Sequence, residues 1–482
     1  MVNFRIIARV FSLLLIVEGL FMLVSAGVSF LYHEHAVSSF IYSAFITIVT
    51  GVIVFTPLRN VERVSGNKEG YLIVTGIWII YTLFGTLPFL LSGSITSFGD
   101  AFFESMSGFT TTGATIFNNV EALPHGILFW RSLTQWMGGM GIIFISLSIF
   151  PVVRSINIQI AATEFSGHQT EKIHPRIKEA ARRLLLIYFG ITIAETIFLI
   201  AGGMPVFDAI CHSFSTMSTG GFSTKNNGIA AFASPYLMTV VTVFMFLAGT
   251  NLALVYFSFK GNFRKAAENN EFVFYTGICI VFIVISGVIL FLKGDISIGK
   301  AIADGAFHAI SIITTTGFYT QNYSLWGYSM ILVIFILMFT GGMAGSTSGG
   351  IKIVRLILVT KNSSQELKRL IHPSAFLPVR LDKRIVSQNT IYNVLVFLTL
   401  YFFVICISTF VIAAMGYDII TSFSTSASML ANIGPSLGTF GPFSNYSALP
   451  MSGKWFLSVL MLLGRLELVT VMILFTRSFY RN

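Results

Sequence analysis

Charge is scarce in this sequence. Asp, Glu, Lys and Arg make up 10% of the 482 residues, whereas soluble domains carry roughly 25%. Cysteine is scarce too, and the three present, Cys211, Cys279 and Cys406, are scattered through apolar segments. That pattern supports neither a disulfide framework nor a zinc site. The sequence also has no P-loop and no dinucleotide-binding fingerprint. These absences argue against redox chemistry and against nucleotide binding by this chain itself.

Room for a soluble catalytic domain is also lacking, because no polar stretch between the apolar segments is long enough. An enzyme built within a membrane would need His, Asp or Glu side chains gathered at one face. Here the ionisable residues recur unit by unit along the chain and do not converge. The sequence therefore predicts no enzymatic activity and no cofactor.

Apolar residues, in contrast, are abundant: they make up 54% of the chain, and the mean hydropathy is +0.80. A membrane span needs about 20 apolar residues. The first apolar run is too long for a signal peptide and lacks a clear cleavage site, so it is predicted to be a span. We expect an all-α integral membrane protein with about ten transmembrane helices. They are predicted near residues 8–31, 37–57, 71–92, 126–153, 184–203, 235–259, 272–292, 326–359, 391–415 and 454–476.

Basic residues lie mainly in the short loops on one side of the predicted spans. Those loops and the two ends of the chain hold 24 of the 30 Lys and Arg residues. The positive-inside rule makes that side cytoplasmic, with both termini inside. Topology explains most of this charge, and contact with anionic lipid is an alternative. A nucleic-acid surface is not supported, because the charge is spread over six loops without an aromatic platform.

Four short segments resemble one another, each a polar, glycine-bearing stretch between two apolar spans. In the first three an Asp precedes a glycine by 13 residues, and in the fourth by 16. Polar, irregular backbone at membrane depth is tolerated only where protein or a watery cavity lines it. The pattern predicts four parallel units of span, re-entrant pore helix, filter and span around one pore, in pseudo-fourfold arrangement. The expected parts are an N-terminal helix pair at 1–58 and pore units at 71–154, 184–260, 272–360 and 391–478.

Each pore helix is expected to begin near its Asp, which would accept hydrogen bonds from free N–H groups. Glu104, His212 and His308 follow four residues later in the first three units, on the same helix face. We interpret them as packing residues, with direct ion contact as the alternative. The negative C-terminal ends of the four helices would favour a cation between them.

A short triplet after each pore helix is the candidate potassium filter. Rings of backbone carbonyls bind a hard monovalent cation, and glycine permits the positive φ that turns successive carbonyls inward. The alternative, four unrelated glycine turns, does not account for their common position. The second unit carries glycine where its counterparts carry threonine, and the fourth departs furthest. The predicted potassium ligands are Thr111, Thr112 and Gly113; Thr219, Gly220 and Gly221; Thr315, Thr316 and Gly317; and Asn432, Ile433 and Gly434.

The second span of each unit is expected to break at glycine: at Gly138-Gly139, Gly249, Gly341-Gly342 and Gly464. For the first, second and fourth of these we favour close helix packing by small residues over a true break. The third span is predicted to contain an intramembrane loop that would obstruct the pore below the filter. Its residues are Gly345, Ser346, Thr347, Ser348, Gly349 and Gly350.

Arg465 is interpreted as the one basic residue well inside a span, where a charge is costly and usually functional. We expect it beneath the filter, against the loop, as a barrier to cations; structural anchoring is the alternative. Asn251 is expected to form helix–helix hydrogen bonds or to line the gate.

At these residues the chain resembles the Trk/Ktr/HKT superfamily of potassium transport proteins, and within it the bacterial TrkH/TrkG branch. The resemblance covers nearly the whole chain. The motifs that carry it are SGFTTTGAT (107–115), QWMGGMGII (135–143), GGFST (220–224), GGMAGSTSGG (341–350), ELKRLIHP (366–373) and LLGRLE (462–467).

The resemblance implies a potassium-selective, channel-like uptake protein in the bacterial cytoplasmic (inner) membrane, with residues 345–350 as its gating loop. It also implies a homodimer in which each protomer encloses a pore. A cytosolic TrkA-like partner with nucleotide-binding domains would regulate it, through docking surfaces at 154–183, 260–271 and 352–390.

Two rival functions stay open at this point. A sodium-dependent or sodium-conducting relative of the Ktr/HKT type would share the fold, but such proteins often carry serine where this sequence has Gly113. An ion-coupled secondary transporter would show inverted repeats and midplane acidic residues, and neither is evident in the sequence.

Overall fold

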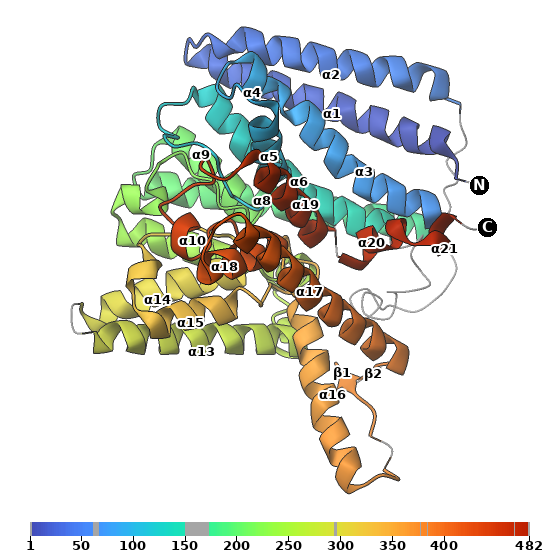
Figure 1. Cartoon of the computed structure of the whole chain (residues 1–482), viewed down its shortest axis with the longest axis vertical. Coiled ribbons are helices and arrows are strands. Elements are labelled where there is room, and N and C mark those ends of the chain that lie inside the picture. The colour runs from blue at the N-terminus through green and yellow to red at the C-terminus, as the bar shows by residue number, and fades with distance from the viewer. Residues whose placement is uncertain are drawn as a thin grey trace.

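The computed structural model describes residues 2–60, 67–149, 173–293, 296–375, 377–382, 384–466 and 468–480. In this part of the chain nearly all regular structure is helical (Figure 1). The strands described are β1 (Arg380–Leu381) and β2 (Arg384–Ile385), which pair antiparallel. The all-α architecture expected from the sequence is confirmed.

An N-terminal pair of long helices, α1 (Phe4–Leu31) and α2 (Ala36–Leu58), lies at one edge of the molecule (Figure 1). Glycine lets the two helices approach closely, because a Cβ at Gly51 would lie 2.9 Å from the Ser12 carbonyl oxygen of the other helix. The pair packs on α3 and α6 of the first pore unit.

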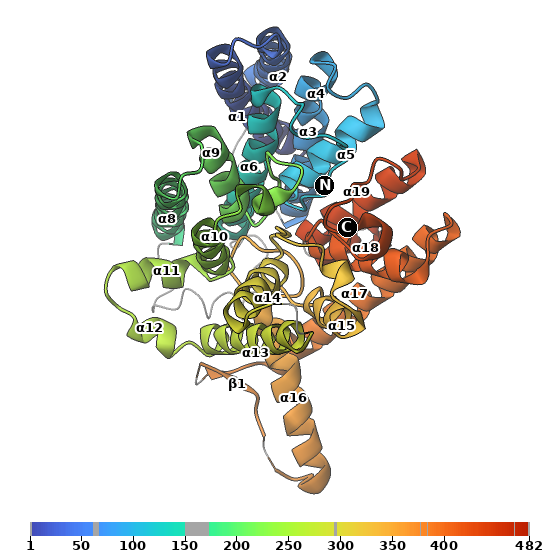
Figure 2. The ribbon, with the colours of Figure 1, turned by 90° about the vertical axis from the view of Figure 1, so that its left-hand side faces the viewer.

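Four pore units surround a common centre, as the blue-to-red succession in Figure 2 shows. Each consists of an outer helix, which the short helix α4 continues in the first unit, a short pore helix, and an inner helix or pair of helices. The units are α3 (Asn67–Gly85), α4 (Leu87–Leu91), α5 (Phe98–Phe109) and α6 (His125–Ile149); α8 (Ile173–Ala201), α9 (Val206–Met217), α10 (Pro235–Ala248) and α11 (Leu252–Phe259); α13 (Asn270–Leu292), α14 (Ile298–Ile313), α15 (Tyr328–Leu337) and α16 (Ile353–Ile371); and α17 (Gln388–Ala414), α18 (Ile419–Ala431), α19 (Met451–Arg465) and α20 (Leu468–Met472).

Short elements connect or end these units. They are α12 (Arg264–Ala267), α21 (Arg477–Tyr480) and the 3-10 turns η1 (Gly228–Phe232), η2 (Tyr323–Leu325), η3 (Gly438–Phe440) and η4 (Ile473–Phe475).

Six of the described spans are long and apolar enough to cross a membrane, and the bent pair α10–α11 makes a seventh. The other three predicted spans fall on α6, on α15 with the start of α16, and on α19 with α20. Residues 150–154 of the first predicted pore unit lie outside the described part of the chain. Apolar side chains stay exposed on the outer faces; on α13, for example, Val273, Ile280 and Val284 are each more than half exposed. An exposed apolar belt of this kind suits a lipid environment.

The inner helices break near the predicted glycines in the second, third and fourth units, so the favoured packing interpretation is confirmed in the first unit and wrong in the second and fourth. In the second unit the inner helix bends by 110° between Ala248 and Leu252. In the third, α15 stops before Gly341, and in the fourth, α19 ends at Arg465, next to Gly464. In contrast, α6 runs through Gly138 and Gly139 without interruption. These glycines serve close packing, because a Cβ at Gly138 would overlap the Phe109 carbonyl at the end of α5.

Helix α16 projects away from the four units (Figures 1 and 2). It begins directly after the 345–350 loop and carries exposed apolar residues near its far end, including Leu367, Leu370 and Ile371. The strands β1 and β2 follow it. Of the docking surfaces expected from the sequence, 260–271 is described throughout, 352–390 except for 376 and 383, and residues 154–172 of the first lie outside the described part.

Candidate ion pathway

The four pore helices end in one repeated backbone conformation. The first residue of each candidate triplet is left-handed: Thr111, Thr219, Thr315 and Asn432 have φ between 53° and 57°. The third residue is a glycine that is also left-handed, with φ of 80° at Gly113, 78° at Gly221, 76° at Gly317 and 98° at Gly434. The fourth segment therefore shares the register of the other three, despite its different residues.

This conformation determines where the carbonyls point. Successive side chains and carbonyls of an extended strand alternate between its two sides. A left-handed residue reverses that alternation, and glycine takes the conformation without a Cβ penalty. Two left-handed residues in three allow successive carbonyls to face one side, as a carbonyl filter requires.

The four segments close into a ring. A Cβ at Gly113 would overlap the Gly220 carbonyl oxygen of the second unit, and one at Gly221 would overlap that of Thr316 in the third. A Cβ at Gly317 would overlap the Ile433 oxygen of the fourth unit. The fourth glycine completes the circuit, since a Cβ at Gly434 would overlap the Thr112 oxygen of the first. Each glycine therefore faces the carbonyl of the next segment, and all twelve predicted filter residues gather around one centre.

Buried hydroxyl and amide groups support the ring from behind. The Thr112 hydroxyl lies 2.8 Å from that of Thr110, and the Thr316 hydroxyl lies 2.8 Å from that of Thr314. Asn432 donates from Nδ2 to the Thr112 hydroxyl at 2.9 Å, which ties the fourth segment to the first. Such fully buried polar networks hold backbone in one geometry.

The expectation that the aspartates cap their pore helices is correct only in the fourth unit, where Asp418 accepts from the Thr421 N–H at 3.1 Å. Asp100 and Asp208 lie in the first turn of their helices and Asp304 is the seventh residue of α14, and all three bind elsewhere. Asp208 accepts from the Thr224 hydroxyl at 2.7 Å, and Asp304 from the Gln321 amide at 2.7 Å. Asp100 pairs with Lys454 at 2.7 Å. Asp208 and Asp304 thus hold the segment of chain that follows the filter glycine.

Glu104, His212 and His308 also hold the segment of chain that follows the filter glycine, which agrees with the packing interpretation. The His212 ring contacts the Ser223 hydroxyl at 3.0 Å, and the His308 ring accepts from the Thr320 N–H at 3.3 Å. Glu104 accepts from the Ile116 N–H at 2.9 Å. Each side chain joins its pore helix to the segment beyond the filter glycine.

Arg131 is a buried basic residue that the sequence interpretation missed. It lies on α6, 2% exposed, and its Nε is 2.8 Å from Glu104 Oε1. It also donates to the Ser223 carbonyl at 3.3 Å and stacks over the Phe222 ring at 4.2 Å. Arg465 is therefore not the one basic residue buried within the helices. A basic residue inside an apolar run, the signal used for Arg465, also marks Arg131.

The 345–350 segment forms a non-helical loop across the inner end of the ring. Gly349 donates its N–H to the Thr315 hydroxyl at 2.7 Å. Thr347 donates to the Met217 carbonyl, at the end of α9, at 2.9 Å. A Cβ at Gly349 would overlap the Ala431 carbonyl at the end of α18. The loop thus contacts the second, third and fourth units immediately beside the filter.

Arg465 connects this loop to the first unit. The side chain is 2% exposed and donates from Nη1 to the Thr347 carbonyl at 2.7 Å and from Nη2 to the Gly138 carbonyl at 3.2 Å. Its charge therefore lies against the loop. Asn251 also contacts this region: its Nδ2 donates to the Ala344 carbonyl at 2.8 Å, while its Oδ1 caps α11.

Glu271, at the start of α13, is a second residue that the sequence interpretation missed. Its Oε1 accepts from the Ala344 N–H at 2.7 Å and the Val354 N–H at 3.1 Å. One carboxylate therefore ties together both ends of the loop. A single acidic residue at a helix start gives no sequence signal for such a role, because the contacts span 83 residues.

Comparison with known proteins agrees with this geometry. Residues 36–479 match the TrkH family, described as cation transport proteins. The chain is 36% identical to the Trk system potassium uptake protein TrkH of Salmonella typhimurium, with 100% of both chains covered. It is 31% identical to the Trk system potassium uptake protein TrkG of Escherichia coli, with 99% of each covered. The crystal structure of the potassium transporter TrkH from Vibrio parahaemolyticus superposes with a TM-score of 0.90, at 34% identity, over 99% of this chain and 100% of that one.

Proposed function

The chain belongs to the TrkH family of cation transport proteins, and on that premise we propose that it takes up potassium through the ring of four filter segments. The observation that carries this proposal is the closed circuit in which each filter glycine faces the carbonyl of the next segment. A ring of backbone carbonyls can replace the hydration shell of a potassium ion. The protein is a multi-pass membrane transporter.

Electrostatics support uptake of a cation. The C-terminal ends of α5, α9, α14 and α18 all precede the filter, and each helix end carries a partial negative charge of about half a unit. A negative membrane potential contributes about 2.3 kcal/mol per charge per 100 mV. A passive pore can therefore accumulate potassium without a covalent step, and a role as an enzyme is not proposed.

The 345–350 loop is the proposed gate. The proposal is supported by the contacts of the loop with Thr315, Met217 and Arg465, since an ion leaving the filter would pass beside them. The Arg465 charge would add an electrostatic barrier to cations. Opening requires these hydrogen bonds to break together, so the loop is a two-state element on which a second site can act.

Regulation and assembly extend the proposal. The loop continues directly into α16, which projects from the four units and would transmit the docking of a partner. We assign that role to a cytosolic TrkA-like subunit with nucleotide-binding domains, since this chain has no nucleotide fingerprint of its own. A homodimer with one pore in each protomer, and both termini on the cytoplasmic side of a bacterial inner membrane, complete the proposed arrangement. The start of α1 and the end of α21 lie on the same side of the molecule (Figure 1).

Flux from proteoliposomes tests the proposal. Purified protein would be reconstituted and the efflux of K⁺, Rb⁺, Cs⁺, Na⁺ and Li⁺ compared. We expect K⁺ and Rb⁺ to pass at least tenfold faster than Na⁺ and Li⁺, a ratio equivalent to about 1.4 kcal/mol. Equal or faster Na⁺ flux would favour the sodium-conducting alternative, although Gly113 argues against it. Flux that required a second ion or substrate would favour a coupled transporter.

A further inference from the structure

The second filter segment lacks a side chain that its counterparts use. The middle residue of the triplet is Thr112 in the first unit and Thr316 in the third, and both hydroxyls are held by a threonine two residues earlier. In the second unit the middle residue is Gly220. Ser218 is present two residues earlier and donates to the Phe214 carbonyl at 2.7 Å, as Thr110 does to that of Met106 at 2.6 Å. The second unit therefore has a hydroxyl two residues before the middle of the triplet, at Ser218, but none at the middle position itself, Gly220.

Backbone geometry does not explain this glycine. Positive φ occurs at Thr219 and Gly221 on either side, but Gly220 itself is not left-handed. Thr112 and Thr316 show that a side chain fits the backbone at the equivalent position. A glycine with ordinary φ is required only where a neighbour fills the space beside its Cα.

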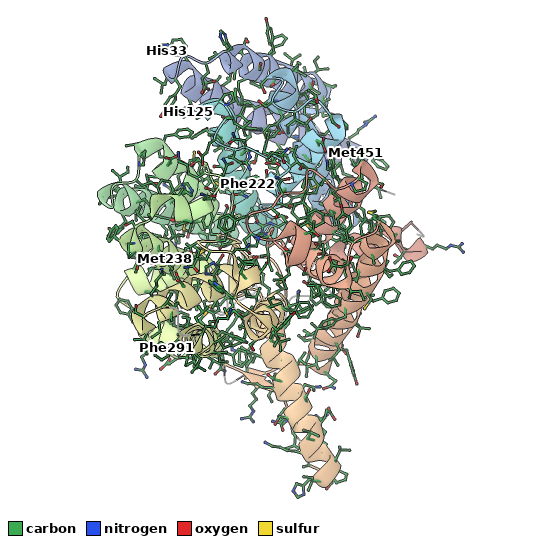
Figure 3. The ribbon with its side chains drawn as sticks, turned by 60° about the vertical axis from the view of Figure 1, so that its left-hand side comes forward. His33, His125, Phe222, Met238, Phe291 and Met451 are labelled. Carbon is green, nitrogen blue, oxygen red and sulfur yellow. The ribbon has the colours of Figure 1, made fainter. Side chains whose placement is uncertain are left out.

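That neighbour is Gln135 of α6. A Cβ at Gly220 would overlap the Cδ, Oε1 and Nε2 atoms of the Gln135 side chain, which is fully buried. The amide also makes two hydrogen bonds to the segment. Its Nε2 donates to the Gly220 carbonyl at 2.6 Å, and its Oε1 accepts from the Phe222 N–H at 3.1 Å. The labelled Phe222 in Figure 3 shows that this segment lies in the middle of the molecule.

We propose that Gln135 is a positioning residue for ion selectivity, which replaces from α6 the side chain missing at Gly220. It bridges the residues before and after Gly221 and fixes the orientation of the Gly220 carbonyl, one of the four in the ring. The bridge is specific to this unit, because the first and third units use a threonine of the filter strand itself. This inference depends on the proposed function, since it assumes that the ring selects potassium.

The inference also explains a neighbouring contact. The Gly220 carbonyl is the oxygen that a Cβ at Gly113 would overlap. Displacement of this carbonyl would therefore disturb the first segment as well as the second. Loss of Gln135 removes both hydrogen bonds and opens a space behind the ring, so the carbonyl is free to rotate out of register.

A set of variants at Gln135 and Gly220 tests the proposal, because it removes the side chain at one position and adds one at the other. Gln135→Leu keeps the bulk and removes both hydrogen bonds, and Gln135→Ala removes the bulk as well. Gly220→Thr alone overfills the site. The double variant Gln135→Ala/Gly220→Thr rebuilds the pattern of the first and third units, with Ser218 available to the new hydroxyl.

Reconstituted protein would be assayed for the K⁺/Na⁺ flux ratio, which does not depend on the amount of active protein. We expect each single variant to lower the ratio at least tenfold and the double variant to recover it to within threefold of wild type. Thr192→Val is the matched control. Thr192 lies on α8, and its hydroxyl accepts a hydrogen bond at 3.2 Å from Nε1 of Trp136, the residue that follows Gln135 on α6. The variant removes this bond, which is away from the filter, and should leave the flux ratio unchanged.

Two results would overturn the inference. One is a wild-type ratio in Gln135→Leu; the other is a double variant no more selective than Gly220→Thr. In both cases a selective wild-type protein leaves the proposed function standing. If the wild-type protein itself does not discriminate K⁺ from Na⁺, the proposed function fails, and this inference fails with it.

Discussion

Substitution of Gly113 provides the sharpest mutational test of the ring. The residue has φ of 80°, and any side chain in such a conformation costs on the order of 1–3 kcal/mol. A Cβ there would also overlap the Gly220 carbonyl oxygen, well inside the 3.0 Å that Cβ atoms keep from a neighbour. Because the interior is packed as closely as an organic crystal, the two segments must part by on the order of 1 Å.

Gly113→Ser should therefore widen the ring on one side and weaken discrimination between ions of different size. We expect the K⁺/Na⁺ flux ratio to fall about tenfold or more, equivalent to at least ~1.4 kcal/mol. The assay is paired efflux of K⁺ and Na⁺ from proteoliposomes. Gly113→Ala should give the same direction of change, because the Cβ and not the hydroxyl causes the overlap.

Gly203→Ala is the matched control for backbone strain. Gly203 has φ of 88°, lies outside the filter between α8 and α9, and a Cβ there would meet no atom within 4 Å. This variant carries the strain of a left-handed alanine without the overlap, and its flux ratio should match wild type. An unchanged ratio in a well-folded Gly113→Ser protein would refute the ring as described.

The remaining predictions concern the gate and the scaffold. Arg465→Ala removes two charge-assisted hydrogen bonds from the closed loop, each worth about 1.5–3 kcal/mol, so basal K⁺ flux should rise at least tenfold; unchanged flux in folded protein would exclude the barrier. Thr347→Val removes the bond to the Met217 carbonyl and should raise flux severalfold with no change in selectivity, which a filter role would alter. Glu271→Ala frees both ends of the loop and should also raise flux in the same assay, whereas Glu268→Ala, at an exposed ion pair nearby, should not. Glu104→Gln unpairs the buried Arg131 and should destabilise the protein by about 3–5 kcal/mol, seen as a lower unfolding temperature in detergent; a wild-type temperature would mean that the pair is not structural.

The helical membrane architecture was predictable because lipid leaves few alternatives. Long apolar runs can be satisfied only by helices that bond their own backbone. The position of the ring of four glycine segments was predictable too, since polar glycine segments in apolar surroundings have no other stable place. The loop at 345–350 followed from its glycine content, which a regular helix does not tolerate.

Other features depend on contacts that no local pattern records. Gly249 is interpreted from the sequence as a close-packing residue within a helix, but α10 ends there and the chain bends by 110°. Asp208 and Asp304 read as helix caps, but their partners follow the filter glycine, 16 and 17 residues away. Gln135 and Glu271 act across 87 and 83 residues of sequence. One sequence shows which residues are polar inside the membrane, but not which of them meet.

The most direct test of the central claim is to locate the ion. Diffraction from crystals grown with Rb⁺ in place of K⁺ would show the ion by its anomalous signal. The account predicts a peak on the axis of the ring, between the carbonyl oxygens of Thr112, Gly220, Thr316 and Ile433, that added K⁺ displaces and added Na⁺ does not. A peak elsewhere in the protein, with none inside the ring, would contradict it.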